Sequence, residues 1–196
     1  MIAASRPGRL WIALATVALL ALGIGVAVIV LERDMPAWYA RLRYPIRYEH
    51  IIAGHAENYR LDGALIAAVI YRESEFDADA VSRAGAVGLM QLLPDTAAGI
   101  ATLTGGNAFE PNDLYNPEIN VRYGSFYLRR LVDKYDSVEL ALAAYNAGQA
   151  NVDRWLAEDR GIAFPETRDF VHDVLELQEV YDRAYGSRIA RSTGEP

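Results

Sequence analysis

The sequence predicts an all-α domain preceded by one transmembrane helix. Three observations favour this fold class. An uncharged apolar stretch occupies residues 10–31, apolar residues beyond it recur with helical spacing, and no alternating strand pattern extends over more than a few residues. The chain has 196 residues, of which 52% are hydrophobic and 23% charged, so it can form one compact domain plus an appendage.

Residues 10–31 read LWIALATVALLALGIGVAVIVL and carry no charge. At about 1.5 Å per residue, a helix of this length spans the roughly 30 Å hydrocarbon core of a bilayer. A cleaved signal peptide would have an apolar region of about 7–15 residues and a small-residue cleavage site. This stretch instead continues directly into Glu32, Arg33 and Asp34, which favours an uncleaved signal anchor.

Basic residues flank the anchor. Arg6 and Arg9 precede it, which predicts a short cytoplasmic N-terminus at residues 1–9 and an extracytoplasmic body in a single-pass cell-membrane protein. The connector, residues 32–45, and the first residues after it carry aromatic residues interleaved with arginines, namely Trp38, Tyr39, Tyr44 and Tyr48 with Arg41, Arg43 and Arg47. Such a segment either contacts lipid headgroups or packs on the folded domain, and the sequence leaves both alternatives open.

The body, residues 46–186, consists of segments with helix-start signals, and a C-terminal tail follows at residues 187–196. Asp, Asn or Ser as N-cap, and Pro in the first turn, favour helix initiation. The first two expected helices are residues 46–59 and a segment that Asp62 caps. Asn116 and Pro117 begin a third at residues 117–135, and Ser137 caps a fourth that ends near Gly148. A short helix at residues 152–157 and a long last helix that begins at Pro165 complete the set. Glycines cluster between residues 85 and 106, so this stretch must contain turns.

One carboxyl group falls on the apolar face of the second helix. At about 100° per residue, Glu73 lies near Ile66 and Ile70. Burial raises the pKa of a carboxyl group, as a general acid working near neutral pH requires. Glu73 is therefore a candidate proton donor, and the alternative is an ion pair with an arginine such as Arg83 or Arg122.

Composition excludes several classes of function. The net charge is −7, and so acidic a chain argues against nucleic acid as a partner. The absence of cysteine excludes disulfide scaffolds and thiolate metal sites. The three histidines, His50, His55 and His172, show no zinc-ligand spacing, and we expect no metal and no other cofactor.

Four motifs follow one another along the body. They read ESEF (73–76) with GAVGLMQLLP (85–94), DLYNP (113–117), AYNAG (144–148) and ETRDFV (166–171). Over about residues 46–182 this order resembles the lytic transglycosylase family with the soluble-lytic-transglycosylase (SLT) domain, which is related to goose-type lysozyme. The resemblance implies a lysozyme-like helical domain. The chain departs from the family pattern at residues 76–79, where the family more often has Asn or Asp followed by Pro, and we expect this to affect loop stiffness rather than chemistry.

The resemblance implies cleavage of the β-1,4 bond between N-acetylmuramic acid and N-acetylglucosamine in peptidoglycan glycan strands, with formation of 1,6-anhydromuramic ends. Substrate-assisted glycosidases need only one carboxyl group, and Glu73 is the expected catalytic acid and base. The expected substrate-binding residues are Ser82, Met90, Gln91, Tyr145 and Asn146, with Met90 packing against a sugar ring. Each has a structural alternative: turn capping for Ser82, loop support for Asn146, and packing in the core for the others.

Two other functions remain open at this point. A lysozyme-type hydrolase of the same fold would complete the cleavage with water, which Asp77 or Asp79 would hold near Glu73. A catalytically inactive module that binds the cell wall, tethered to the membrane through residues 10–31, would instead position a larger secretion or division assembly. Its partners would then include cell-wall assembly proteins. The reaction product distinguishes the three functions, because it carries a 1,6-anhydro end, carries a reducing end, or does not form.

Overall fold

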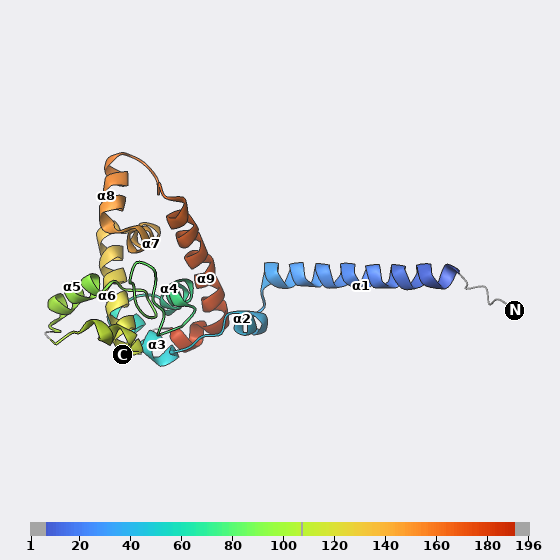
Figure 1. Cartoon of the computed structure of the whole chain (residues 1–196), viewed down its shortest axis with the longest axis horizontal. Helices are drawn as coiled ribbons and strands as arrows, with labels where there is room; N and C mark the ends of the chain where they lie inside the picture. The colour runs from blue at the N-terminus through green and yellow to red at the C-terminus, as the bar shows by residue number, and fades with distance from the viewer. Residues whose placement is uncertain (1–6, 107, 191–196) are drawn as a thin grey trace.

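The structure, a computed structural model, describes residues 7–106 and 108–190. Within these ranges the regular structure consists of helices α1 to α9, the 3-10 helix η1 and two isolated β-bridges. Helices α2 to α9 gather into a body from which α1 extends as one long helix (Figure 1). The predicted all-α class with one apolar N-terminal helix is confirmed.

Helix α1 spans Pro7–Asp34 and contains the predicted anchor, residues 10–31. Its segment Trp11–Ile29 is long and apolar enough to cross a membrane, and none of it is buried inside the protein. A long apolar helix of a soluble domain would instead pack into the core. The N-terminal residues 1–6, which the sequence predicts to be cytoplasmic, lie outside the described residues.

The predicted helix starts are confirmed where a side-chain cap was expected. Three side-chain oxygens accept hydrogen bonds from backbone amides in the first turns. Asp62 accepts one from Ala64 N (2.9 Å), Asn116 accepts one from Glu118 N (2.9 Å), and Ser137 accepts one from Leu140 N (3.2 Å). The corresponding helices and their neighbours are α3 (Glu49–Tyr59), α4 (Gly63–Ser74), α6 (Pro117–Tyr135), α7 (Val138–Ala147), α8 (Gln149–Ala157) and α9 (Pro165–Ile189).

Three elements were not expected from the sequence: α2 (Ala37–Arg43), α5 (Pro94–Thr104) and η1 (Pro111–Tyr115). Helix α2 and η1 are short, so the apolar spacing within each is too brief to indicate a helix. Helix α5 lies in the glycine-rich stretch from which turns were expected, and its N-cap residue, Leu93, offers no side-chain cap that would mark a helix start. Helix α9 also continues beyond residue 186. Its Ile189 is buried, and an added Cβ on Gly63 would collide with the Ile189 carbonyl, so the folded body extends to this residue.

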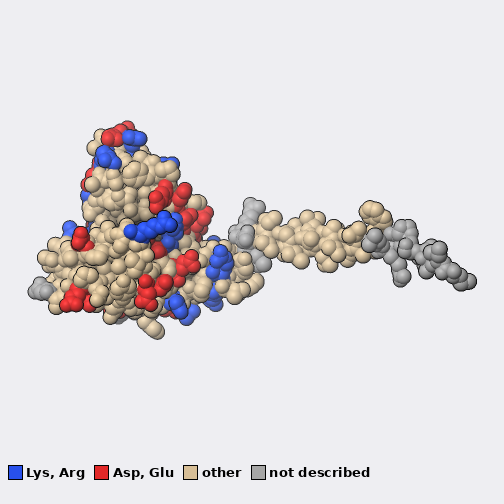
Figure 2. All heavy atoms as spheres, viewed as in Figure 1, with Lys and Arg blue, Asp and Glu red and all other residues tan. Residues whose placement is uncertain are grey.

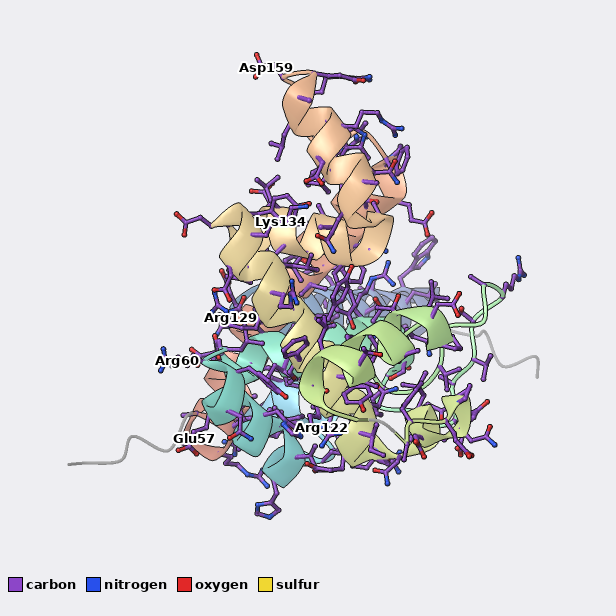
Figure 3. All side chains as sticks on the ribbon, turned by 90° about the vertical axis from the view of Figure 1, so that its left-hand side faces the viewer. Glu57, Arg60, Arg122, Arg129, Lys134 and Asp159 are labelled. Atoms are coloured by element: carbon purple, nitrogen blue, oxygen red, sulfur yellow. The ribbon has the colours of Figure 1, made fainter. Side chains whose placement is uncertain are left out.

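Helix α4 forms the centre of the body. Its residues from Gly63 to Ile70 are all buried, and α9 packs along it. Helices α3, α6 and α7 complete the core around this pair. In Figure 3, Arg122 and Lys134 mark the two ends of the long part of α6 that passes behind α5. The C-terminal end of α4 is thus held by surrounding helices, and this end carries Glu73.

The connector packs on the domain, one of the two alternatives that the sequence left open. Ala40 of α2 is fully buried. The Arg41 side chain donates through Nε to the Ala184 carbonyl of α9 (2.8 Å), and the Tyr185 hydroxyl donates to the Tyr44 carbonyl (3.2 Å). These contacts fix α2 on the surface of α9.

Candidate active site

Glu73 lies in the last turn of α4, after a run of buried residues. Its side chain is partly buried, and Ile66 and Ile70 on the same helix face are fully buried. Loss of hydration raises the pKa of Glu73 to about 7, against the smaller opposing effect of the positive charge on Arg72. The predicted rise in pKa is confirmed, and the carboxyl group holds a proton close to neutral pH.

The alternative role for Glu73, an ion pair with an arginine, is not observed. Arg72 pairs instead with Asp173 of α9 (2.9 Å). Arg122 lies over the ring of Tyr123, 5.0 Å from its centroid. Among the described side chains Glu73 forms no salt bridge, so no ion pair offsets the effect of burial on its pKa.

The end of α4 is attached to the loop that follows it. The Ser74 hydroxyl lies 2.9 Å from the carbonyl oxygen of Leu89 and 3.1 Å from that of Ile70. Glu75 and Phe76 then adopt positive φ angles of 51° and 64°, which reverse the chain direction, and Phe76 is buried. Ser74 is a positioning residue that the sequence analysis missed, because a serine at a helix end has many ordinary roles.

Asn120 of α6 holds the loop from the other side. Its side chain is fully buried. Its amide oxygen accepts from Met90 N (2.8 Å), and its amide nitrogen donates to the carbonyls of Val87 (2.9 Å) and Leu114 (2.8 Å). One side chain therefore satisfies three buried backbone groups that would otherwise lack partners. Asn120 belongs to the second of the family motifs that the sequence resembles, but the sequence analysis assigned no role to its side chain.

The structure corrects the role expected of the Met90 side chain. Its side chain is fully buried and packs so closely on Gly124 that an added Cβ there would overlap with it, so the expected contact between Met90 and a sugar ring is wrong. Its backbone carbonyl instead accepts a hydrogen bond from the Tyr145 hydroxyl (2.7 Å). Leu93 is the apolar side chain of this segment that is open to solvent, at 44% exposed.

Tyr145 connects the loop with the candidate acid. The pKa of its phenol is raised, first by burial and then by the negative charge of Glu73, which indicates that the two groups are near each other. The Tyr127 ring lies 5.5 Å from the Tyr145 ring, centroid to centroid. The Tyr145 hydroxyl therefore stays protonated and keeps its bond to the Met90 carbonyl.

A pocket of about 250 Å³ opens beside Tyr145. Three of the predicted residues, Gln91, Tyr145 and Asn146, line it. The sequence analysis did not select the other lining residues, which are Leu92, Leu93, Thr96, Tyr127, Ala147 and Gly148. A second hollow of about 410 Å³ shares Thr96 and Tyr127 with it and extends between α5 and α6. Glu73 is not among the residues that line the pocket, but its charge acts on Tyr145, which is.

The remaining predicted residues have structural contacts of their own. The Ser82 hydroxyl accepts from Ala86 N (3.0 Å) and so caps an exposed turn. Gln91, at a φ of 47°, donates through its amide nitrogen to the carbonyls of Ala80 (3.1 Å) and Gly88 (2.9 Å). The exposed Asn146 accepts through its amide oxygen from the Thr167 hydroxyl (2.8 Å). Their substrate contacts stay predictions.

Asp77 and Asp79, the residues on which the hydrolase alternative depends, are both exposed. The Asp77 carboxylate accepts from Asp79 N (3.0 Å), within the turn after α4. In the described ranges no group of three or more His, Asp or Glu side chains could hold a metal ion.

The helical body with its partly buried acid belongs to a known class of domain. The chain is a member of the transglycosylase SLT domain family, whose model matches residues 50–165. It is 29% identical over 160 residues to the soluble lytic murein transglycosylase of Salmonella typhimurium, covering 76% of this chain and 25% of that protein. It is 38% identical over 128 residues to the membrane-bound lytic murein transglycosylase C of Histophilus somni, covering 60% of this chain and 35% of the relative.

The fold agrees with a solved structure from the same family. An inactive Glu-to-Gln mutant of the lytic transglycosylase Slt from Pseudomonas aeruginosa superposes with a TM-score of 0.69 at 32% identity, covering 75% of this chain and 26% of that one. The chain spans about a quarter to a third of the length of these relatives. The lysozyme-like helical domain inferred from the four motifs is confirmed.

Asn120→Ala should lower the free energy of unfolding by about 3 kcal/mol, because it leaves buried backbone groups without partners. Urea denaturation followed by circular dichroism measures the change. Asn58→Ala, at an exposed position of α3, is the matched control and should change the stability little. An equal effect of both substitutions would contradict the role assigned to Asn120.

Glu73→Gln should change how stability depends on pH. Below about pH 4.5 the carboxyl group is protonated in both folded and unfolded chains. As the pH rises from there to about 7, only the unfolded chain releases this proton, so the unfolding free energy of the unsubstituted protein falls. The unfolding free energy of Glu73→Gln lacks this loss. At about 1.4 kcal/mol per pKa unit, the difference in unfolding free energy between the variant and the unsubstituted protein should therefore shift by about 3 kcal/mol in favour of the variant from pH 4.5 to pH 8.

The control for this measurement is Glu75→Gln, which alters an exposed neighbouring carboxylate. Urea midpoints at several pH values compare the three proteins. A constant difference between Glu73→Gln and the unsubstituted chain across this range would show that Glu73 titrates normally.

Proposed function

We propose that this chain is a membrane-anchored peptidoglycan lytic transglycosylase. It cleaves the β-1,4 bond between N-acetylmuramic acid and N-acetylglucosamine and leaves a 1,6-anhydromuramic end. The observation that carries the proposal is the partly buried Glu73, whose pKa of about 7 suits a group that must act as acid and then as base. Membership of the SLT family and the names of its relatives support the same reaction.

In the first step Glu73, in its protonated form, donates its proton to the glycosidic oxygen as the bond to the anomeric carbon breaks. The acetamido oxygen of the muramic residue attacks that carbon, so the substrate supplies the nucleophile. This leaves an oxazolinium ring on the sugar and an ionised Glu73. A partly buried carboxyl group without a salt bridge suits this step, because it can release its proton near neutral pH.

In the second step the Glu73 carboxylate removes the proton from the C6 hydroxyl of the same sugar. The oxygen attacks the anomeric carbon, opens the oxazolinium ring and restores the acetamide. Glu73 is protonated again, and no water is consumed. We assign Gln91, Tyr145 and Asn146 to substrate binding because they line the pocket beside Tyr145, and Ser82 on its family resemblance.

Leu93 takes the role first expected of Met90, contact with a sugar face. It is exposed and lines the pocket with Thr96 and Tyr127. An apolar side chain and an aromatic ring in the lining of one small pocket suit the apolar faces of a sugar. The neighbouring hollow between α5 and α6 can take further units of the glycan strand.

We assign α1 to a single membrane crossing with the body on the extracytoplasmic side, where peptidoglycan lies. The uncharged, unburied segment Trp11–Ile29 supports the crossing, and Arg6 and Arg9 before it support the direction. The short connector to the body would confine cleavage to peptidoglycan near the membrane.

Glu73→Gln should abolish turnover, with a loss of at least about 100-fold. The full chain in detergent is incubated with purified peptidoglycan, and the released muropeptides are analysed by mass spectrometry. Active protein should release products lighter by one water than the hydrated forms. Glu75→Gln should retain activity. Reducing-end products would favour the hydrolase, and no release by the unsubstituted chain would favour the wall-binding module.

Activity should also decline as the pH rises above about 7. The free protein must hold the proton on Glu73 to begin the reaction, so kcat/KM should fall about tenfold per pH unit once the carboxyl group is ionised. Initial rates of anhydro-product release between pH 5 and 9 test this. A rate that stays level up to pH 9 would show that Glu73 is not the proton donor.

A further inference from the structure

Helix α2 presents an apolar face that nothing else in the described chain covers. Trp38 is 61% exposed and Leu42 75% exposed. They are four residues apart and share one side of the helix. At about 100° per residue, Ala40 lies directly opposite the midpoint of this pair, and Ala40 is the residue buried against the body. One side of α2 therefore faces the body, and the other side carries a tryptophan and a leucine to solvent.

The contacts with α9 prevent this apolar face from turning inward. The Arg41 bond to the Ala184 carbonyl (2.8 Å) and the Tyr185 bond to the Tyr44 carbonyl (3.2 Å) hold the helix at its C-terminal half. The Trp38 ring meets the Tyr39 ring edge-on, with centroids 5.8 Å apart. Burying Trp38 and Leu42 against the body would require α2 to detach from α9.

Positive charge lies on both sides of the apolar face. Arg41 and Arg43 flank it around the helix, and the exposed Arg47 follows shortly after. Figure 2 shows basic residues gathered on the part of the body that adjoins the apolar arm. Tryptophan and arginine together are typical of the bilayer interface, where the ring sits at headgroup level and the guanidinium contacts lipid phosphates.

The position of α2 along the chain brings this face to the membrane surface. Only Met35 and Pro36 separate α2 from α1. Three steps of extended chain, from Asp34 to Ala37, cover at most about 11 Å. A helix this close to the end of a membrane crossing can reach the headgroup region.

We propose that α2 lies on the outer surface of the bilayer, with Trp38 and Leu42 inserted at the boundary between headgroups and acyl chains and the exposed Arg43 and Arg47 on anionic lipid phosphates. This inference rests on the proposed membrane crossing by α1. Because α2 is bound to lipid on one side and to α9 on the other, it holds the body at a fixed orientation to the membrane. The body is then not a freely tethered domain, and its pocket faces the peptidoglycan at a constant angle.

The absence of cysteine from the chain allows a direct test. Leu42→Cys in the full chain carries a nitroxide spin label, and the protein is placed in nanodiscs of phosphatidylcholine with phosphatidylglycerol. Collision rates with oxygen, which enters lipid, and with a water-soluble nickel chelate are compared. We expect an oxygen-to-nickel ratio several-fold higher at residue 42 than at Leu103→Cys, a position of similar exposure on α5.

A third label, at Val17→Cys within the apolar segment of α1, separates the two proposals. A lipid-exposed label at residue 17 with a water-exposed label at residue 42 would overturn the inference on α2 and leave the membrane crossing intact. A water-exposed label at residue 17 would overturn the crossing, and the inference with it. Equal immersion of residue 42 in nanodiscs of phosphatidylcholine alone would overturn the role given to the arginines.

Discussion

The candidate site depends on the desolvation of one carboxyl group at the end of a buried helix. Because every residue from Gly63 to Ile70 is buried, the last turn of α4 emerges at the edge of the core rather than in solvent. Glu73 on this turn loses part of its hydration, and its charge raises the pKa of Tyr145, which lines the pocket. Complete burial would block a substrate, and full exposure would leave an ordinary carboxylate that is ionised at neutral pH.

Neighbouring residues contribute position rather than chemistry. Ser74 attaches the helix end to the loop through Leu89, and Asn120 attaches the same loop to α6. The Tyr145 hydroxyl makes the third attachment, at Met90. All three act on backbone carbonyls or amides within a few residues of one another, so the loop has little freedom to move away from Glu73. A rigid arrangement of this kind keeps an acid and its substrate at reacting distance.

The same principle applies to the proposed membrane attachment. A single crossing helix on a flexible linker would let the domain sample many orientations. Here the linker is short, and α2 is bonded to α9 through Arg41 and Tyr185, so the body and the interfacial face of α2 move as one unit. The site and the membrane are then related by packing within the domain, not by the length of a tether.

The sequence by itself determined the helical class, the long apolar N-terminal helix and most helix starts. Caps such as Asp62 and Asn116 and the period of apolar residues act locally, and the resemblance of four ordered motifs indicated Glu73, Gln91 and Tyr145. Only the tertiary structure decided that Met90 is core, that Leu93 is exposed and that Asn120 holds the loop. It also decided which face of α2 is buried. These outcomes depend on which distant backbone groups and side chains meet after folding, and local spacing does not encode that information.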